Sequence, residues 1–202
     1  IVTGVYGSRA TIQDGAGAYS GIWVDGSNVA LQVGDAVDVS GTVAENYDLT
    51  QLTSPSVTVL SQGNALPAAE VLSTLDVSAE QWEGVLVQTS GVVENDALGY
   101  GEWSINDASG TALVDDAGFN AITAGLTTIG SSVQVTGSLD YSFGAFKIQP
   151  RDVNDVLTYG CTSPAADNYD SAASIEVQAD DNQNSQSDVL TNRIQALIDN
   201  PP

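Results

Sequence analysis

Residues 33 to 43 read V-G-D-A-V-D-V-S-G-T-V, and this stretch decides the fold that the sequence predicts. Val37, Val39 and Val43 lie at alternate positions among small or polar residues, a pattern that indicates a strand with one buried face. Gly41 falls within the same alternation, and a glycine inside a strand permits a sharp bend. Similar short runs, bounded by Gly, Asp or Asn turns, occur at residues 20–25, 56–60, 84–93, 102–105, 111–114, 131–139 and 145–149. The pattern predicts an all-β fold.

The deciding stretch has a counterpart in the second half of the chain. Residues 33–41 match residues 129–137 at an offset of 96, and Leu52 matches Ile148 at the same offset. The pattern Ile-x-Asp-x-x-Gly, which begins at Ile12, recurs 93 residues later. Three separated matches in register indicate an internal duplication.

Each copy holds five short strands, which is typical of a small closed barrel of the OB type. We therefore expect two tandem OB-like five-stranded barrels, at residues 1–66 and 83–158. Residues 67–82 form the linker, and residues 68–75 after Pro67 are predicted to be a short helix. Residues 159–202 form an acidic C-terminal extension that ends in a second short helix.

Four segments carry a resemblance to a known family. Thr11–Trp23, Val33–Val43, Leu49–Leu52 and Val133–Pro150 resemble the OB-fold domains of secreted bacterial proteins, including the accessory domains of YhcR-type extracellular nucleases. The resemblance implies the fold, and it implies little about function because such domains accompany many partners. Gly160–Asp170 is similar to a G-C-T-x-P-x-A-x-N-Y segment of exported proteins, in which a second cysteine usually follows.

Composition excludes several functions. The 202 residues contain 4 Lys+Arg, 26 Asp+Glu and no His, which gives a net charge of −22, while 42% hydrophobic residues suffice for a core. Nucleic acids and anionic lipids are disfavoured because their phosphates require cations, and no apolar run is long enough to span a membrane. No nucleophile and base can be paired, so we expect a protein that is not an enzyme. The absence of Met and the abundance of Asp, Ser, Thr and Gly predict an exported protein, extracellular or at the cell surface.

The first copy is shorter than the second at its start. Its opening run, which includes Ile1, Val2 and Val5, aligns with residues from about Val92 onward, so about half of the first strand has no counterpart. A barrel that lacks half a strand exposes backbone hydrogen-bonding groups and an apolar side. Two readings stay open at this stage: residues ahead of Ile1 complete the strand, or a strand from another subunit does so by β-augmentation.

The C-terminal extension offers the pieces for such a contact. Ser174–Gln178 alternates like a strand, with Ile175 and Val177 on one face, and is the candidate donor. After an N-cap at Ser187, an amphipathic helix is expected to dock through residues including Leu190, Ile194 and Leu197. Cys161 is the only cysteine, and it is either a buried thiol or one half of an intermolecular disulfide.

Loop carboxylates suggest a structural Ca²⁺ site, because Ca²⁺ prefers hard oxygen ligands. The candidate ligands lie in two groups, Asp167, Asn168 and Asp170, and Asp180 with Asp181. A complete EF-hand loop is not present in the sequence.

Aromatic residues suggest the alternative function of a ligand-binding accessory module of a secreted enzyme, for carbohydrate or single-stranded nucleic acid. Tyr19, Trp23 and Tyr47 are the candidate stacking rings in the first copy, unless Trp23 belongs to the core. Rings of the second copy are candidates as well: Tyr100, Trp103, Tyr141, Phe143 and Phe146. The expectation that we favour is an exported structural subunit that assembles with itself, head to tail, into a filament or surface layer by strand donation.

Overall fold

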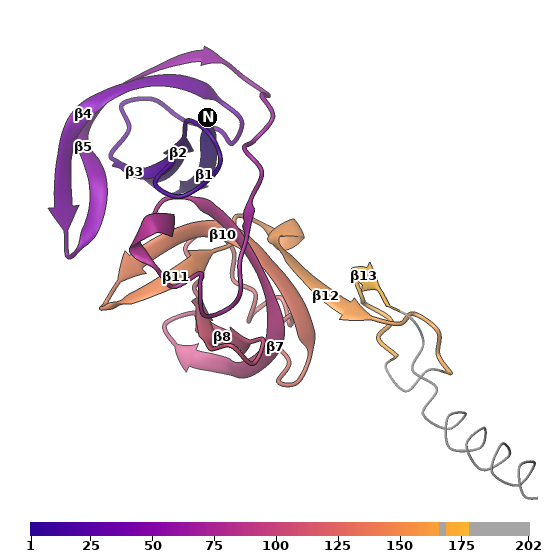
Figure 1. The fold of residues 1–202 in the computed structure, drawn as a ribbon. Helices are drawn as coiled ribbons and strands as arrows, with labels where there is room; N and C mark the ends of the chain where they lie inside the picture. The colour runs from indigo at the N-terminus through magenta and orange to yellow at the C-terminus, as the bar shows by residue number, and fades with distance from the viewer. Residues whose placement is uncertain (166–168, 178–202) are drawn as a thin grey trace, which may run out of the picture. The chain divides into compact units, whose positions relative to one another are not determined.

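The computed structural model describes residues 1–165 and 169–177. The chain divides into two units, Ile1–Leu157 and Thr158–Pro202. The first unit contains two sheets and almost no helix (Figure 1). The all-β prediction is confirmed.

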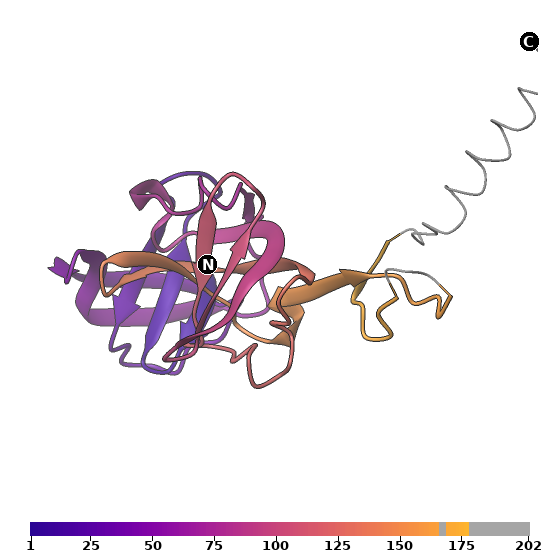
Figure 2. The same ribbon diagram turned by 90° about the horizontal axis from the view of Figure 1, so that it is seen from below.

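The first sheet follows the order β1-β2-β3-β5-β4. Its strands are β1 (Val2–Tyr6), β2 (Arg9–Gln13), β3 (Gly21–Asp25), β4 (Ala36–Asn46) and β5 (Leu49–Ser61). The long hairpin of β4 and β5 curves around the three short strands, and it lies at one side of the first unit in both views (Figures 1 and 2).

The second sheet closes into a barrel, because β10 pairs with β7 as well as with β11. The barrel strands are β7 (Leu86–Gly99), β8 (Glu102–Asn106), β9 (Thr111–Val114), β10 (Ser132–Ser142) and β11 (Ala145–Gln149). Short elements flank it: β6 (Glu70–Val71), the 3₁₀ turns Glu80–Trp82 and Val153–Asp155, and β12 (Val156–Gly160). Trp103, Ile105, Val133 and Ile148 fill its interior. The expected five-stranded barrel is therefore present in the second copy.

The duplication is visible in matching backbone hydrogen bonds. Val2 forms two backbone hydrogen bonds with residues 34 and 35. The N–H of Val2 donates to the carbonyl of residue 35 (2.8 Å), and the N–H of residue 34 donates to the carbonyl of Val2 (2.9 Å). Val93 makes the same two bonds with residues 130–131. Val2 is thus the counterpart of Val93. The barrel strand continues ahead of Val93, and Leu86–Val92 pairs with β10.

The first sheet has no equivalent of that pairing. Within residues 1–165 and 169–177, β4 pairs with β5 alone and β1 pairs with β2 alone. The first copy is therefore an open five-stranded sheet. Two barrels were expected, and the described residues form one closed barrel, in the second copy.

The predicted helix at residues 68–75 is wrong. Residues 70–71 form β6, which pairs in parallel with Val87 and Gln88 of β7. Thr74 is buried and donates from its hydroxyl to Asp107 (2.6 Å). Pairing with β7 gives residues 70–72 extended backbone partners in place of helical hydrogen bonds.

The second unit contains β13 (Ile175–Glu176), paired in parallel with Tyr159 and Gly160 of β12. The helix predicted near the C-terminus lies outside the described residues.

Candidate functional site

The open edge of β4 is the candidate site. The carbonyl of Asp35 points to Val2, and backbone groups along a strand point to the same side at every second residue. Val37 and Val39 therefore direct their N–H and C=O groups away from β5. In the second copy, the corresponding side of β10 is paired with β7. Val57, opposite Val39, donates its own N–H away from β4, to Asn28 (2.8 Å), as this alternation requires.

The side chains on this edge confirm that a layer of contacts is missing. Val133 and Val135 of β10 are fully buried, whereas their counterparts Val37 and Val39 are only half-buried. A cavity of about 380 Å³ opens beside Val37. Its lining is apolar at several positions and includes Ile1, Ile12, Tyr19 and Ile22. A strand added to β4 would cover this apolar side and pair its backbone.

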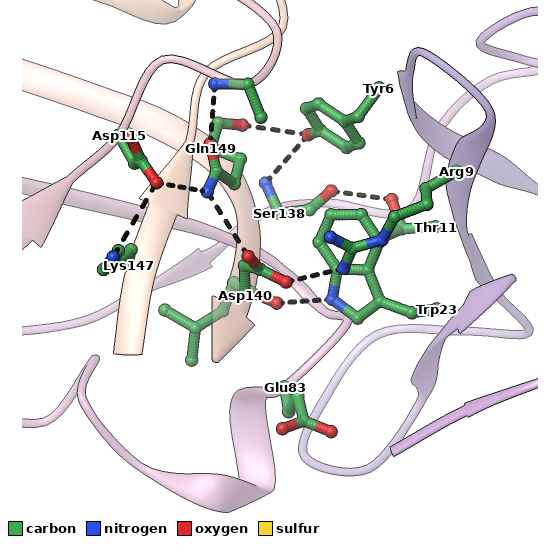
Figure 3. Close-up of polar contacts among 12 residues, drawn as sticks. Tyr6, Arg9, Thr11, Trp23, Glu83, Asp115, Ser138, Asp140, Lys147 and Gln149 are labelled. Atoms are coloured by element: carbon green, nitrogen blue, oxygen red, sulfur yellow. Dashed lines mark hydrogen bonds and ion pairs between the residues drawn. The ribbon is translucent and has the colours of Figure 1, made fainter. Parts of the chain in front are cut away.

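A polar network holds the open sheet on the closed barrel (Figure 3). The guanidinium of Arg9 lies over the ring of Trp23 (4.1 Å to the centroid) and donates to Asp140 Oδ1 (2.7 Å). Trp23 Nε1 donates to the carbonyl of Leu139 (2.9 Å). Asp140 and Trp23 are buried, so these bonds form in a region of low dielectric where they are strong.

Further contacts extend the network along β1 and β2. Tyr6 donates its hydroxyl proton to the carbonyl of Gln149 (2.9 Å), and the hydroxyls of Thr11 and Ser138 lie 2.7 Å apart. Burial raises the pKa of Tyr6 to about 12. No pattern in the sequence predicted this interface, because the partners in its polar network are separated by more than 110 residues and follow no periodic pattern.

Each lysine and arginine side chain within the described residues is engaged by a carboxylate. The ion pairs are Arg9–Asp140, Lys147–Glu102 and Arg151–Asp155. The hydrogen bonds that Arg151 donates to Asp155 raise the pKa of the Arg151 guanidinium. These cations are neutralised within the fold, whereas contacts to nucleic acid phosphates require available cations. That nucleic acid is not a partner stays a prediction.

The predicted assembly residues separate into three groups. Ile1 lines the cavity beside β4, while Val2 is fully buried in its own sheet and Val5 is half-buried. Ile175 and Val177 do alternate on one face, and Ile175 is paired with β12 of the same chain. Leu190, Ile194 and Leu197 lie outside the described residues.

Cys161 is buried, with 3% of its surface exposed. Burial favours the buried-thiol reading of this residue. An intermolecular disulfide would require the surrounding segment to open.

The candidate stacking rings differ in exposure. Tyr19 and Tyr47 are exposed by 74% and 89%. Trp23 is 1% exposed and packs on Tyr6 and Arg9, so it is a core residue and its prediction as a ligand-binding ring is wrong.

The candidate calcium ligands lie mostly outside the described part of the chain, which includes only Asp170 of the five. Asp170 accepts a hydrogen bond from the N–H of Ala172 (2.8 Å). Residues 1–165 and 169–177 contain no group of three or more His, Cys, Asp or Glu side chains that could hold a metal.

Glu83 is a buried carboxyl where the linker meets the first sheet. Its Oε1 accepts from the N–H of Thr50 (2.7 Å), and its Oε2 is buried without a partner among the described residues. Burial, with smaller contributions from Glu80 and Glu45, raises the pKa of Glu83 to about 7. This carboxyl therefore titrates near neutral pH.

Comparison with known protein families, curated proteins and solved structures gives no match to this chain. The resemblance to OB-fold accessory domains and to the exported G-C-T segment stays a prediction. In the described part of the chain, none of the helical segments has the length and apolar character needed to cross a membrane.

Proposed function

We propose that this protein is a non-enzymatic structural subunit that assembles with copies of itself by adding a strand to the open edge of β4. The observation that carries the proposal is the comparison of the two halves of the internal duplication. Seven residue pairs join β7 to β10 in the closed barrel, whereas the corresponding edge of β4, on the side away from β5, is unpaired within the described residues.

The donor that we propose is the segment beginning at Ser174 in a second subunit. Ile175 and Val177 provide the alternating apolar face that the open side of β4 requires. In its own chain this segment pairs over two residues with Tyr159 and Gly160. Flanking backbone hydrogen bonds run from the N–H of Ser174 to the carbonyl of Thr158 and from the N–H of Val177 to the carbonyl of Gly160, each 3.0 Å. Exchange of that short pairing for a longer antiparallel one would increase the number of backbone hydrogen bonds.

Such a contact joins one surface of the first subunit to a different surface of the second subunit. A contact between unlike surfaces generates an open chain of subunits unless its rotation closes a ring. The proposed product is therefore an extracellular filament or layer. The charge of −22 per subunit opposes close packing, and divalent cations such as Ca²⁺ would relieve this repulsion.

The experiment completes the first sheet within the same chain. A variant carries the sequence of Val85–Gly91, V-L-V-Q-T-S-G, ahead of Ile1, so that Ile1 takes the place of Val92. The control variant carries seven residues with two prolines, which cannot pair along β4. Mass and shape are measured by light scattering and negative-stain microscopy, with calcium and with chelator.

We expect multimers from the natural chain and from the proline control, and monomers from the completed variant. Deletion of residues 174–202 should also leave monomers with folded sheets. A natural chain that remains a monomer of about 21 kDa would overturn the proposal. Multimers that persist in the completed variant would place the contact elsewhere.

A further inference from the structure

Two hairpins place an aromatic ring at the same position of the duplication. Tyr47 lies at the tip of the β4–β5 hairpin, and Phe143 lies at the tip of the β10–β11 hairpin, 96 residues later. Their exposed fractions are 89% and 99%. Exposed rings contribute little to a core, so burial does not explain their presence at both tips. The ring of Phe143 does have a neighbour in the fold, since Lys147 Nζ lies 5.2 Å from its centroid.

The backbone at both tips is in a conformation that favours glycine. Tyr47 has φ of 54° and Phe143 has φ of 53°. A non-glycine residue in the left-handed region is strained, commonly by about 1 kcal/mol or more. Hairpin tips of this kind are usually occupied by Asn or Gly, which adopt the conformation readily. The two aromatic rings are thus held in place against a local energetic preference.

The two tips line one cavity of about 680 Å³ within the first unit. Tyr141 and Leu49 give it apolar walls, and Arg9 lines it beside the ring of Trp23. Asn46, Asp48 and Ser142 add amide, carboxylate and hydroxyl groups. This volume lies in the range of small-molecule sites, which combine mainly apolar walls with a few polar groups. We name it the aromatic cleft.

The charge of the protein restricts the ligand. A net charge of −22 repels anions, and the guanidinium of Arg9 is already paired with Asp140. A pyranose ring is uncharged and presents a face of C–H groups that packs against an aromatic ring, whose face is electron-rich. Its hydroxyl groups match the amide and hydroxyl groups of Asn46 and Ser142.

We infer that the aromatic cleft binds a neutral oligosaccharide, with Tyr47 and Phe143 stacking on sugar rings. This site is independent of the β4 edge, since neither Val37 nor Val39 lines it. Binding here and assembly through β4 can therefore fail or succeed separately.

The test uses glycine substitutions, because glycine relieves the strain at the tips while removing the ring. Binding of cellohexaose, laminarihexaose, maltohexaose and N-acetylchitohexaose is measured by calorimetry for the natural chain, Tyr47→Gly and Phe143→Gly. We expect one or more of the four to bind, and each substitution to weaken that binding by about tenfold or more. The melting temperature should stay unchanged or rise.

Tyr100→Gly is the matched control. Tyr100 is 99% exposed at the tip of the β7–β8 hairpin, with φ of 54°, and it does not line the cleft. Its substitution should leave binding unchanged. The inference is overturned if none of the four oligosaccharides binds, if a single-stranded oligonucleotide binds instead, or if Tyr100→Gly weakens binding as much as Tyr47→Gly.

Discussion

The ion pair of Arg9 and Asp140 should account for much of the stability of the open first sheet. Within the described residues no strand closes that sheet along β4, and the sheet contacts the barrel through the polar network around Arg9. Arg9 Nη2 lies 2.7 Å from Asp140 Oδ1, and the side chains are exposed by 32% and 5%. Arg9→Met would leave a buried carboxylate whose remaining side-chain partner is the amide of Gln149 at 3.5 Å.

Loss of one partner from a fully buried pair costs 3–5 kcal/mol in general, and the partial exposure of Arg9 reduces this to about 2–3 kcal/mol. For a chain of this length, the melting temperature should fall by about 4–12 °C. The free energy of unfolding is measured by urea titration followed by tryptophan fluorescence. Asp140→Asn in the Arg9→Met background should recover about 1 kcal/mol or more, because no charge is then left unpaired. A loss below about 0.5 kcal/mol for Arg9→Met, or additive effects in the double variant, would refute this reasoning.

Two further predictions concern Glu83 and a pair of equivalent glycines. The raised pKa of Glu83, about 7 in the folded state against 4.5 ordinarily, means that the contribution of Glu83 to stability is fully present below about pH 4.5 and is lost as pH rises through 7. Glu83→Gln should therefore be more stable than the natural chain at pH 8, by about 2 kcal/mol, and nearly equal to it at pH 5 in urea titrations; equal stability at both pH values would contradict this. A Cβ at Gly137 would lie 2.4 Å from the carbonyl of Gln149, whereas one at Gly41 would lie 3.1 Å from backbone. Thermal melting should show a loss of about 2–4 kcal/mol for Gly137→Ala and about 1 kcal/mol or less for Gly41→Ala, and the reverse order would show that the bend is not what requires glycine.

The strands were predictable from the sequence because alternation reflects burial on one face. The runs at 111–114 and 145–149 coincide with β9 and β11, and the offset of 96 correctly equated Leu52 with Ile148, since each pairs in parallel with the third strand of its own sheet. Residues 68–75 were predicted incorrectly, because pairing of β6 with β7 overrides a weak helical pattern.

The candidate site was only partly predictable. The difference in length of the first strand could be inferred by aligning the two copies. The same alignment matches Tyr47 with Phe143, and this match could have identified the aromatic cleft. The sequence left two readings of Trp23 open, a core residue or a stacking ring. It could not decide between them, because the burial of Trp23 depends on docking between the two copies, which leaves no local pattern in either.

The most direct test of strand addition is amide hydrogen exchange at the edge of β4. Exchange of Val37 and Val39 is compared between concentrated multimers and diluted monomers, with Val133 and Val135 as the equivalent amides that β7 already covers. The account predicts that Val37 and Val39 exchange rapidly in the monomer and slowly in the multimer, while Val133 and Val135 are protected in both. Rapid exchange of Val37 and Val39 in the multimer would show that subunits join through another surface and would contradict the account.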